Sequence, residues 1–313
     1  MDEYPKTPKE FDALFASEEA CREYLIRLRW PSGVVCPMCQ GVKVWHTKRD
    51  LMHCSDCGYQ ISITAGTIFH GTRKPLSLWF RAMWYVTGQK TGTSALGMQR
   101  ILGLASYRTA WTWMHKLRRA MVRPGRERLS GIVEVDETYI GGQKEGKRGR
   151  GAAGKAIVLV AAEINGSRTG RIRLMRIADV SGDSLGKAIQ QSIEPGSTIQ
   201  TDGWSGYCQL DSIGYHHQVV RTIEEIGDNL LPHCHKVASL LKRWMLGTHQ
   251  GAISHEHLEY YLDEFTFRFN RRTSRHRGKL FYRLVQQSVA VEPQPYKDII
   301  KHSRGLKPQK HNR

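Results

Sequence analysis

Two pairs of closely spaced cysteines constrain this chain more than any other feature. The sequences CPMC and CSDC lie fourteen residues apart, and their thiols belong to Cys36, Cys39, Cys54 and Cys57. Each C-x2-C loop turns two thiolates toward one point, and two such loops close a tetrahedral zinc site. A redox C-x2-C motif would explain one pair, but not two evenly placed pairs. The pattern therefore predicts a zinc ribbon over residues 31–70, with one structural Zn²⁺ per chain.

The charge of the chain is strongly biased toward base. Its 313 residues include 47 Lys and Arg against 29 Asp and Glu, a formal net charge of +18. Such a surplus is typical of proteins that bind a polyanion, with nucleic acid as the first candidate and an anionic membrane surface as the second. No apolar run approaches the ~20 residues of a transmembrane helix, and the N-terminal MDEYPKTPKEFDALF is unlike a signal peptide. We therefore expect a cytoplasmic, nucleoid-associated protein.

Residues 1–30 and 71–125 have helical patterns. In the second range, Ser94 and Ser106 precede apolar periodic stretches as candidate caps, and Gly103 lies in the turn between them. Two helices joined by a short turn, the second of them basic, are typical of a helix-turn-helix DNA-binding region. A plain helical bundle with a solvated basic face would give the same pattern. The neighbouring zinc ribbon favours DNA binding, for which the candidate contacts are Arg108, Lys116, Arg118 and Arg119.

Strand patterns replace helical ones from about residue 129 onward. Three strand-like stretches cover residues 131–141, 155–164 and 170–180. A helix-like stretch follows, and a fourth strand leads into TDG at 201–203. This order predicts a ribonuclease-H-like catalytic domain, which is a mixed α/β sheet flanked by helices.

Two aspartates lie where the first and fourth strands of such a sheet are neighbours. Asp136 is in the first strand, and Asp202 ends the fourth. Facing carboxylates attract hard divalent cations such as Mg²⁺, and a pair of such ions supports phosphoryl transfer. For VEVDE alone, a half-buried strand with Glu134, Asp136 and Thr138 facing water is the simpler interpretation. The second aspartate favours the catalytic pair.

The chain resembles the zinc-ribbon insertion-sequence transposases of bacteria in three motifs. These are VDETYIGG, TDGWSGY and HKVASLLKRWMLGTHQGAISHEHLEYYLDEFTFRFNRR. The resemblance runs from the ribbon to about Ala290 and implies a DDE-type catalytic domain over residues 129–290. It implies cleavage and joining of double-stranded DNA at the ends of a mobile element, with Mg²⁺ or Mn²⁺ as the catalytic ion. Asp136 and Asp202 would be the first two catalytic residues and the metal ligands. A homodimer or higher oligomer is expected in the complex that brings the DNA ends together.

The third catalytic position departs from the family pattern. The family usually places Glu or Asn on a helix, with Lys seven residues later. Here Lys242 fits that lysine, and counting back reaches His235. Imidazole is a poorer ligand than carboxylate for Mg²⁺, although acceptable to Mn²⁺, and it can instead hydrogen-bond the scissile phosphate. The alternative is that His235 is a packing histidine and a distant acid such as Glu256 completes the site.

A basic stretch ends the expected catalytic domain. Residues 254–279 are expected to form one helix, whose last turns have many bases, no acid, and interleaved Phe267 and Phe269. This composition favours contact with the phosphate backbone, and the candidate contacts are Arg268, Arg271, Arg272 and Arg275. Residues 291–313 are expected to be a basic tail.

The function we expect is a DNA transposase; the alternatives are a zinc-ribbon and helix-turn-helix transcription regulator, or a ribonuclease-H-like nuclease without strand transfer.

Overall fold

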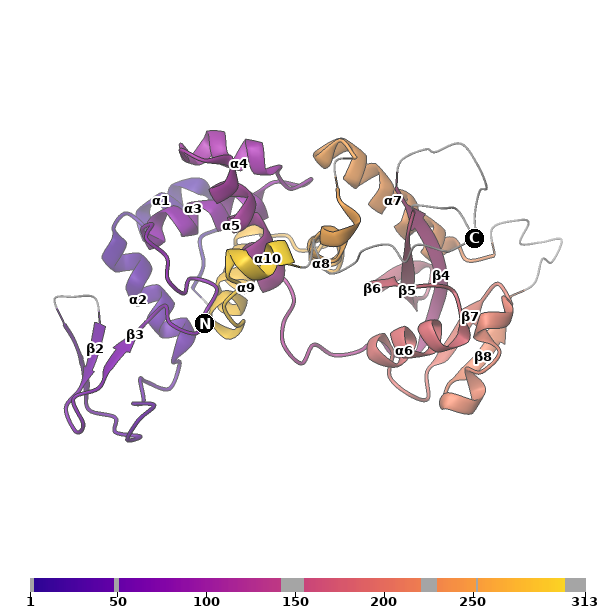
Figure 1. The fold of residues 1–313 in the computed structure, drawn as a ribbon, viewed down its shortest axis with the longest axis horizontal. Helices are drawn as coiled ribbons and strands as arrows, with labels where there is room; N and C mark the ends of the chain where they lie inside the picture. Colours follow the sequence, from indigo (N-terminus) through magenta and orange to yellow (C-terminus); the bar gives the residue numbers. More distant parts are fainter. Residues whose placement is uncertain (1–2, 48–50, 142–154, 221–229, 252, 302–313) are drawn as a thin grey trace. The chain divides into compact units, whose positions relative to one another are not determined.

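The chain forms two compact units in the computed structural model, which describes residues 3–47, 51–141, 155–220, 230–251 and 253–301 (Figure 1). The first unit contains the described residues up to Gly125 and those from Ser274 onward, and the second contains Arg126–Thr273. The second unit is therefore an insertion within the first. The expected ranges 129–290 and 291–313 divide the chain differently, because the segment after Ser274 packs with the N-terminal helices.

Helices build most of the first unit. They are α1 (Pro8–Leu14), α2 (Glu18–Arg29), α3 (Leu76–Gly88), α4 (Ala95–Leu102), α5 (Tyr107–Ala120), α9 (Arg277–Ala290) and α10 (Tyr296–Lys301). Phe281 of α9 is fully buried, and its ring lies 5.5–5.8 Å from those of Phe11, Phe15 and Phe80. Residues from both ends of the chain thus share one aromatic core. Within the expected tail, α10 is an ordered helix with Ile299 buried, whereas 302–313 lie outside the described residues.

The turn between α4 and α5 follows the sequence signals closely. The hydroxyl of Ser94 accepts a hydrogen bond from the Gly97 amide at 3.1 Å, which caps α4. Gly103 ends α4 with φ 61°, in the left-handed region that glycine tolerates. Ser106 precedes α5 as expected, although its side chain makes no capping hydrogen bond. The two helices and the short connection between them are thus present, and their role as a DNA-binding helix-turn-helix stays a prediction.

The zinc-ribbon region contains a small antiparallel sheet in the order β1 (Val44–His46), β2 (Leu51–Cys54), β3 (Gln60–Ser62). Val44 pairs with Cys54, so the start of the hairpin lies beside the second cysteine pair. Met52 and Ile61 are paired and buried, and they supply the apolar side of this sheet. The sheet has little other apolar content, as expected of a fold that depends on a bound metal.

The second unit is built on a five-stranded mixed sheet. The strands are β4 (Ile132–Ile140), β5 (Ala156–Asn165), β6 (Arg168–Ile177), β7 (Thr198–Thr201) and β8 (His216–Val219), in the order β6-β5-β4-β7-β8. The first three are antiparallel neighbours, whereas β7 runs parallel to β4 and β8 parallel to β7. This is the ribonuclease-H-like arrangement predicted from the sequence. Only β8, a short polar strand, has no counterpart in that prediction.

Helices cover both faces of the large sheet (Figure 1). Helix α6 (Gly182–Ser192) packs on the face that carries Val133 and Val135. Helices α7 (Pro232–His249) and α8 (Leu258–Phe269) pack on the other face, against Val158 and Val160. Because side chains alternate along a strand, Glu134 and Asp136 point to the α7 side of β4. The simpler interpretation, in which these acids face open water, is therefore wrong for Glu134, which is 2% exposed.

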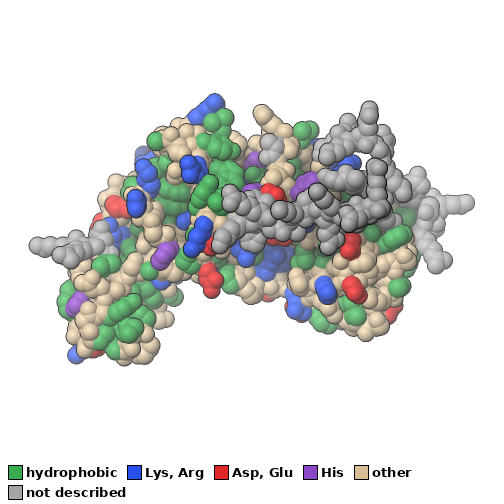
Figure 2. Space-filling view, viewed as in Figure 1, with side chains coloured by type: hydrophobic (Ala, Val, Ile, Leu, Met, Phe, Trp, Pro, Cys, Tyr) green, Lys and Arg blue, Asp and Glu red, His purple; other side chains and the backbone are tan. Residues whose placement is uncertain are grey.

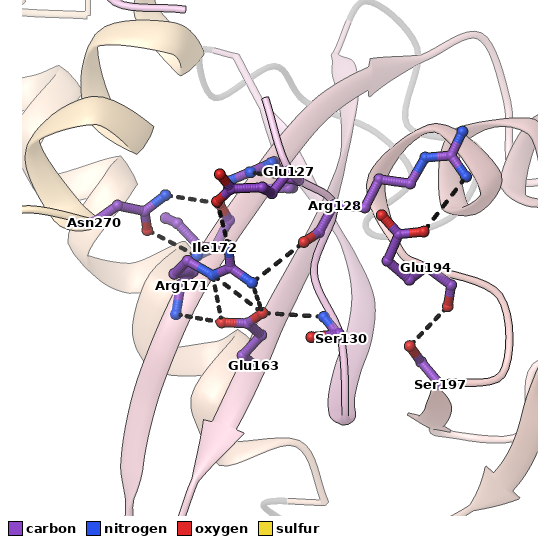
Figure 3. A network of polar contacts seen from close by, with 10 residues as sticks. Glu127, Arg128, Ser130, Glu163, Arg171, Ile172, Glu194, Ser197 and Asn270 are labelled. Atoms are coloured by element: carbon purple, nitrogen blue, oxygen red, sulfur yellow. Dashed lines mark hydrogen bonds and ion pairs between the residues drawn. The ribbon is translucent and has the colours of Figure 1, made fainter. Parts of the chain in front are cut away.

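A polar network joins the start of β4 to the antiparallel strands (Figure 3). The guanidinium of Arg171 donates from Nη2 and Nε to the two oxygens of Glu163, at 2.7 and 2.9 Å. The same carboxylate accepts a hydrogen bond from the Ser130 amide at 3.0 Å. The side chain of Asn270 bonds both the amide and the carbonyl of Ile172, at 2.8 and 3.1 Å. Asn270 thus satisfies backbone groups on the edge strand β6.

The expected helix over residues 254–279 is interrupted in the structure. A short 3-10 turn, His255–His257, precedes α8, which ends at Phe269, and α9 begins only at Arg277. The residues between the two helices turn the chain from the second unit back to the first. The prediction of a single helix is therefore wrong.

Candidate functional site

The four predicted zinc ligands meet at one point. The sulfur atoms of Cys36, Cys39, Cys54 and Cys57 all lie within 4.8 Å of one another. Cys36 and Cys57 are 3.6 Å apart and Cys39 and Cys54 are 3.5 Å apart, so neither pair forms a disulfide. Zn–S bonds of about 2.3 Å in a tetrahedron give S–S edges of about 3.8 Å, so the cluster fits one Zn²⁺.

The two cysteine loops have the same backbone design. The amide of Cys36 donates to the carbonyl of Gly41, and Cys54 donates in the same way to Tyr59. In each loop the residue after the second cysteine has a left-handed conformation: Gln40 with φ 61° and Gly58 with φ 74°. Beyond this turn, the backbone amides of Gly41 and Tyr59 donate to the sulfur atoms of Cys39 and Cys57, and such amides stabilise thiolates. The loops are therefore built as a pair around one ion.

The predicted catalytic residues on β4 and α7 are in contact. Nε2 of His235, in the first turn of α7, lies 3.4 Å from Oδ2 of Asp136. Burial, together with the nearby charges of Glu137 and Asp202, raises the pKa of Asp136 to about 6, although His235 acts in the opposite direction. Negative charge thus accumulates where a cation would offset it. These oxygen and imidazole donors fit Mg²⁺ or Mn²⁺.

Asp202 lies close enough to Asp136 for its charge to raise the pKa of that carboxyl. The parallel pairing of β4 with β7 runs as far as Glu134 with Gln200, and Asp202 follows just past the end of β7. One carboxylate oxygen of Asp202 accepts from the Trp204 amide at 3.0 Å, which orients the side chain at the end of β7. In the part of the chain that the structure describes, only the cysteine cluster has three or more such donor atoms within 4.8 Å. The acidic site is therefore a looser arrangement than the zinc site.

Lys242 and Glu256 differ in their relation to Asp136. Desolvation and the charge of Lys155 lower the pKa of Lys242, while the carboxylate of Asp136 raises it. Lys242 therefore lies within electrostatic reach of Asp136. Glu256 belongs to the 3-10 turn before α8, and no contact between it and Asp136 is found among the described residues. Of the two candidates for the third position, His235 is thus the one with a contact to Asp136.

Glu134 has a structural role that the sequence did not reveal. The N-cap residue of α7, Leu231, offers no side-chain acceptor, and the carboxylate of Glu134 takes its place. Its Oε2 accepts from the amide of Cys234 at 2.9 Å, and Oε1 lies 4.0 Å from Nε2 of His233. An anion at a helix N-terminus satisfies otherwise unpaired amides and interacts favourably with the helix dipole. Glu134 thus fixes the start of α7 to the strand that carries Asp136.

Glu134→Ala is expected to loosen the start of α7. It leaves buried amides without an acceptor, at a cost of about 1–3 kcal/mol in the free energy of unfolding. Hydrogen exchange should accelerate at the first-turn amides of α7. The matched control is Glu18→Ala, which removes a similar remote cap from α3, where Glu18 accepts from Leu76 and Ser77. In Glu18→Ala, hydrogen exchange should accelerate only at amides of the first unit and stay unchanged at α7. Unchanged exchange at α7 in Glu134→Ala would contradict the capping role.

The predicted DNA contacts divide into exposed and buried groups. Lys and Arg side chains are visible over both units (Figure 2). Arg118 is only 2% exposed, and Arg268 is 9% exposed and forms an ion pair with buried Glu264 at 2.8 Å. These two arginines are unsuited to a phosphate contact, because their guanidinium groups are not at the surface. The remaining candidates are Arg108, Lys116, Arg119, Arg271, Arg272 and Arg275, of which Lys116 and Arg271 are half-buried.

A cysteine-rich ribbon joined to a ribonuclease-H-like sheet with paired acids is the architecture of a DNA-processing transposase. Residues 128–270 match the ISXO2-like transposase domain, and residues 16–60 match the transposase zinc-ribbon domain. Together the two matches cover more than half of the chain. Residues 128–270 thus belong to the ISXO2-like transposase domain family, and residues 16–60 to the transposase zinc-ribbon family.

Two other comparisons add little. A search of curated proteins found no match. One solved structure that matches is a simian T-cell lymphotropic virus intasome, determined by cryo-EM in complex with PP2A regulatory subunit B56 gamma. The match has 16% identity and a TM-score of 0.30, and it covers 52% of this chain and 63% of that chain. That score is too low to define a common fold, so the fold assignment rests on the sheet order. No helix among the described residues is long and apolar enough to cross a membrane.

Proposed function

We propose that this transposase binds the ends of a mobile DNA element, cleaves a strand there, and joins the 3′-OH end to target DNA. The observation that carries the proposal is the contact of Asp136 with His235 at 3.4 Å, with the charge of Asp202 close enough to act on Asp136. Transcription regulation alone would need no such cluster. A zinc ribbon and a basic first unit on the same chain support binding to the phosphate backbone.

Asp136 and Asp202 would hold Mg²⁺ or Mn²⁺. When bound, such ions supply activation of the attacking oxygen and stabilisation of charge on the leaving oxygen. His235 orients the carboxylate of Asp136 from the first turn of α7 and faces the same site. Lys242, two turns further along the helix, contacts a phosphate of the DNA. We also propose a homodimer or higher oligomer as the form that holds two DNA ends together.

The decisive experiment combines the zinc-loaded chain with duplexes of candidate element ends, Mg²⁺ and a supercoiled target plasmid. The expected product is a covalent joint between the end duplex and the plasmid. A pre-cleaved duplex that ends at the cleavage point in a 3′-dideoxynucleotide is the matched control, because it has no 3′-OH to join and no strand left to cleave. Nicking with water and no joining would instead indicate a nuclease. Binding with neither reaction would indicate a regulator.

His235→Ala is expected to reduce strand cleavage by roughly 10- to 100-fold, the usual cost of losing a group that orients a metal ligand. His235→Glu should retain part of the Mg²⁺-dependent activity, because a carboxylate suits that ion. The control is His216→Ala, an exposed histidine of β8 in the same unit. His233 is a poor control, because its ring bonds Thr169 at 2.8 Å. Full activity in His235→Ala together with an inactive Glu256→Ala would assign the third position to Glu256.

A further inference from the structure

A basic pocket of about 310 Å³ lies in the first unit, whereas the residues assigned to catalysis belong to the second. Residues of α5 form one wall, the segment 71–74 forms another, and Tyr296 of α10 lines it as well. Four of the side chains that line it are cations, Arg73, Lys74, Arg108 and Lys116, and none is an acid. The pocket is therefore a concave surface of a single charge sign.

Lys116 is the cation that most needs a counter-charge. It is half-buried, and among the described residues its ammonium donates a single 3.4 Å hydrogen bond, to the carbonyl of Ile68. Burial lowers the pKa of Lys116, which reflects the free-energy cost of a poorly solvated ammonium. Among the described residues, none of the four cations forms an ion pair with a carboxylate. An anion from outside the chain would offset this cost.

The geometry of the pocket favours a phosphate group over a nucleobase. Arg108 and Thr109 belong to the first turn of α5, where the helix dipole is positive. The indole rings of Trp79 and Trp113 stack on each other at 3.7 Å and are 1% and 5% exposed. Their faces are thus already covered, whereas a base would need an open aromatic face to stack on. The exposed ring of Tyr296 also lines the pocket, but the guanidinium of Arg108 lies over it, 5.8 Å from the ring centroid. The pocket therefore presents cations, one of them held against its exposed aromatic ring.

We propose that this pocket binds a phosphate of the DNA backbone, with Lys116 as its inner cation and Lys74 and Arg108 beside it. The inference rests on the proposed DNA-binding function and specifies how α5 takes part in it. Backbone contacts fix register but carry no direct sequence information. Helix α5 therefore acts at this pocket as a clamp on the phosphate chain, and Arg108 and Lys116 do not read bases.

The test is the affinity of the full-length, zinc-loaded chain for labelled duplexes, measured by fluorescence anisotropy across a range of salt concentrations. Lys116→Met keeps the length of the side chain but removes its charge, and Lys74→Met does the same at the exposed rim. Each should weaken binding roughly three- to tenfold, equally for element-end and random duplexes, and reduce the slope of log K against log [salt] by about 0.9. Lys9→Met on α1, an exposed lysine outside the pocket, is the matched control and should leave the slope unchanged.

Inorganic phosphate provides a second arm that needs no DNA end. At equal ionic strength, phosphate should compete with DNA for the wild type better than chloride does, and Lys116→Met should abolish the difference.

An unchanged salt slope in both pocket variants would overturn the proposal, even if the wild type joins DNA normally. Loss of affinity for element ends only would also overturn it, because that result means base recognition. Selective phosphate binding with an unchanged DNA slope would define a free-anion site instead. The pocket variants could reduce the salt slope as expected while the wild type joins no DNA ends. In that case the proposed function would fail and the phosphate pocket would stand.

Discussion

Asp136→Asn and Asp202→Asn are each expected to abolish strand cleavage while binding of DNA ends persists. An amide is a weaker ligand than a carboxylate for a hard divalent cation. A metal ion contributes several kcal/mol of charge stabilisation in the transition state, so its loss costs roughly 10³-fold or more in rate. The measurement is single-turnover cleavage of an end duplex in Mg²⁺, with binding followed separately by anisotropy.

In Asp136→Asn, the loss of activity should not come from unfolding. Folding disfavours the ionised form of Asp136, whose pKa is raised to about 6 by burial and by the charges of Glu137 and Asp202. Above that pH the ionised carboxylate destabilises the metal-free fold, and asparagine removes this cost. The control is Asp183→Asn in the first turn of α6, which changes the same charge on the opposite side of the sheet. Normal strand transfer by Asp136→Asn or Asp202→Asn would refute the metal-binding pair.

Cys54→Ser is expected to lower bound zinc from one ion per chain to almost none and to unfold the ribbon. Cys54 is fully buried at the end of β2 and pairs with Val44, so it joins the metal site to the hairpin. Structural zinc contributes about 10–16 kcal/mol of apparent binding free energy in small zinc domains, and the ribbon sheet has few apolar residues to replace it. Elemental analysis of the purified chain measures the stoichiometry.

Cys208→Ser is the matched control for this experiment, because Cys208 is exposed and lies outside the cluster. Binding to DNA ends should fall with the loss of zinc. Hydrogen exchange in β4 and β5 should stay unchanged, since these strands belong to the second unit. A Cys54→Ser chain that retains one zinc would refute the four-cysteine site.

The sequence predicted those parts of the fold that depend on local pattern. The zinc ligands, the cap at Ser94 and the apolar strands β4, β5 and β6 each have a strong short-range signal. Strand β8 has the sequence HHQV and no apolar alternation, so only its pairing with β7 reveals it. Arg268 shows a different limit. Its four-residue spacing from Glu264 is visible in the sequence, but the burial that makes the pair internal is not.

The residues of the candidate site could be predicted from the sequence, but the contacts that hold them in place could not all be predicted. Strand order alone implies that Asp136 and Asp202 are neighbours, and helical spacing links His235 to Lys242. The contact of Glu134 with the first turn of α7 joins positions that are 100 residues apart. No local pattern encodes such a contact, because it depends on how α7 docks on the sheet.

The insertion of the second unit within the first has a consequence for the order in which the chain can fold on the ribosome. The core of the first unit includes Phe281 of α9, so the N-terminal helices cannot complete that core until α9 has been made. At ~5–20 residues per second, synthesis of the inserted unit and α9 delays this step by roughly 10–30 s. The acidic site can therefore form on the nascent chain while the unit with the ribbon is still incomplete.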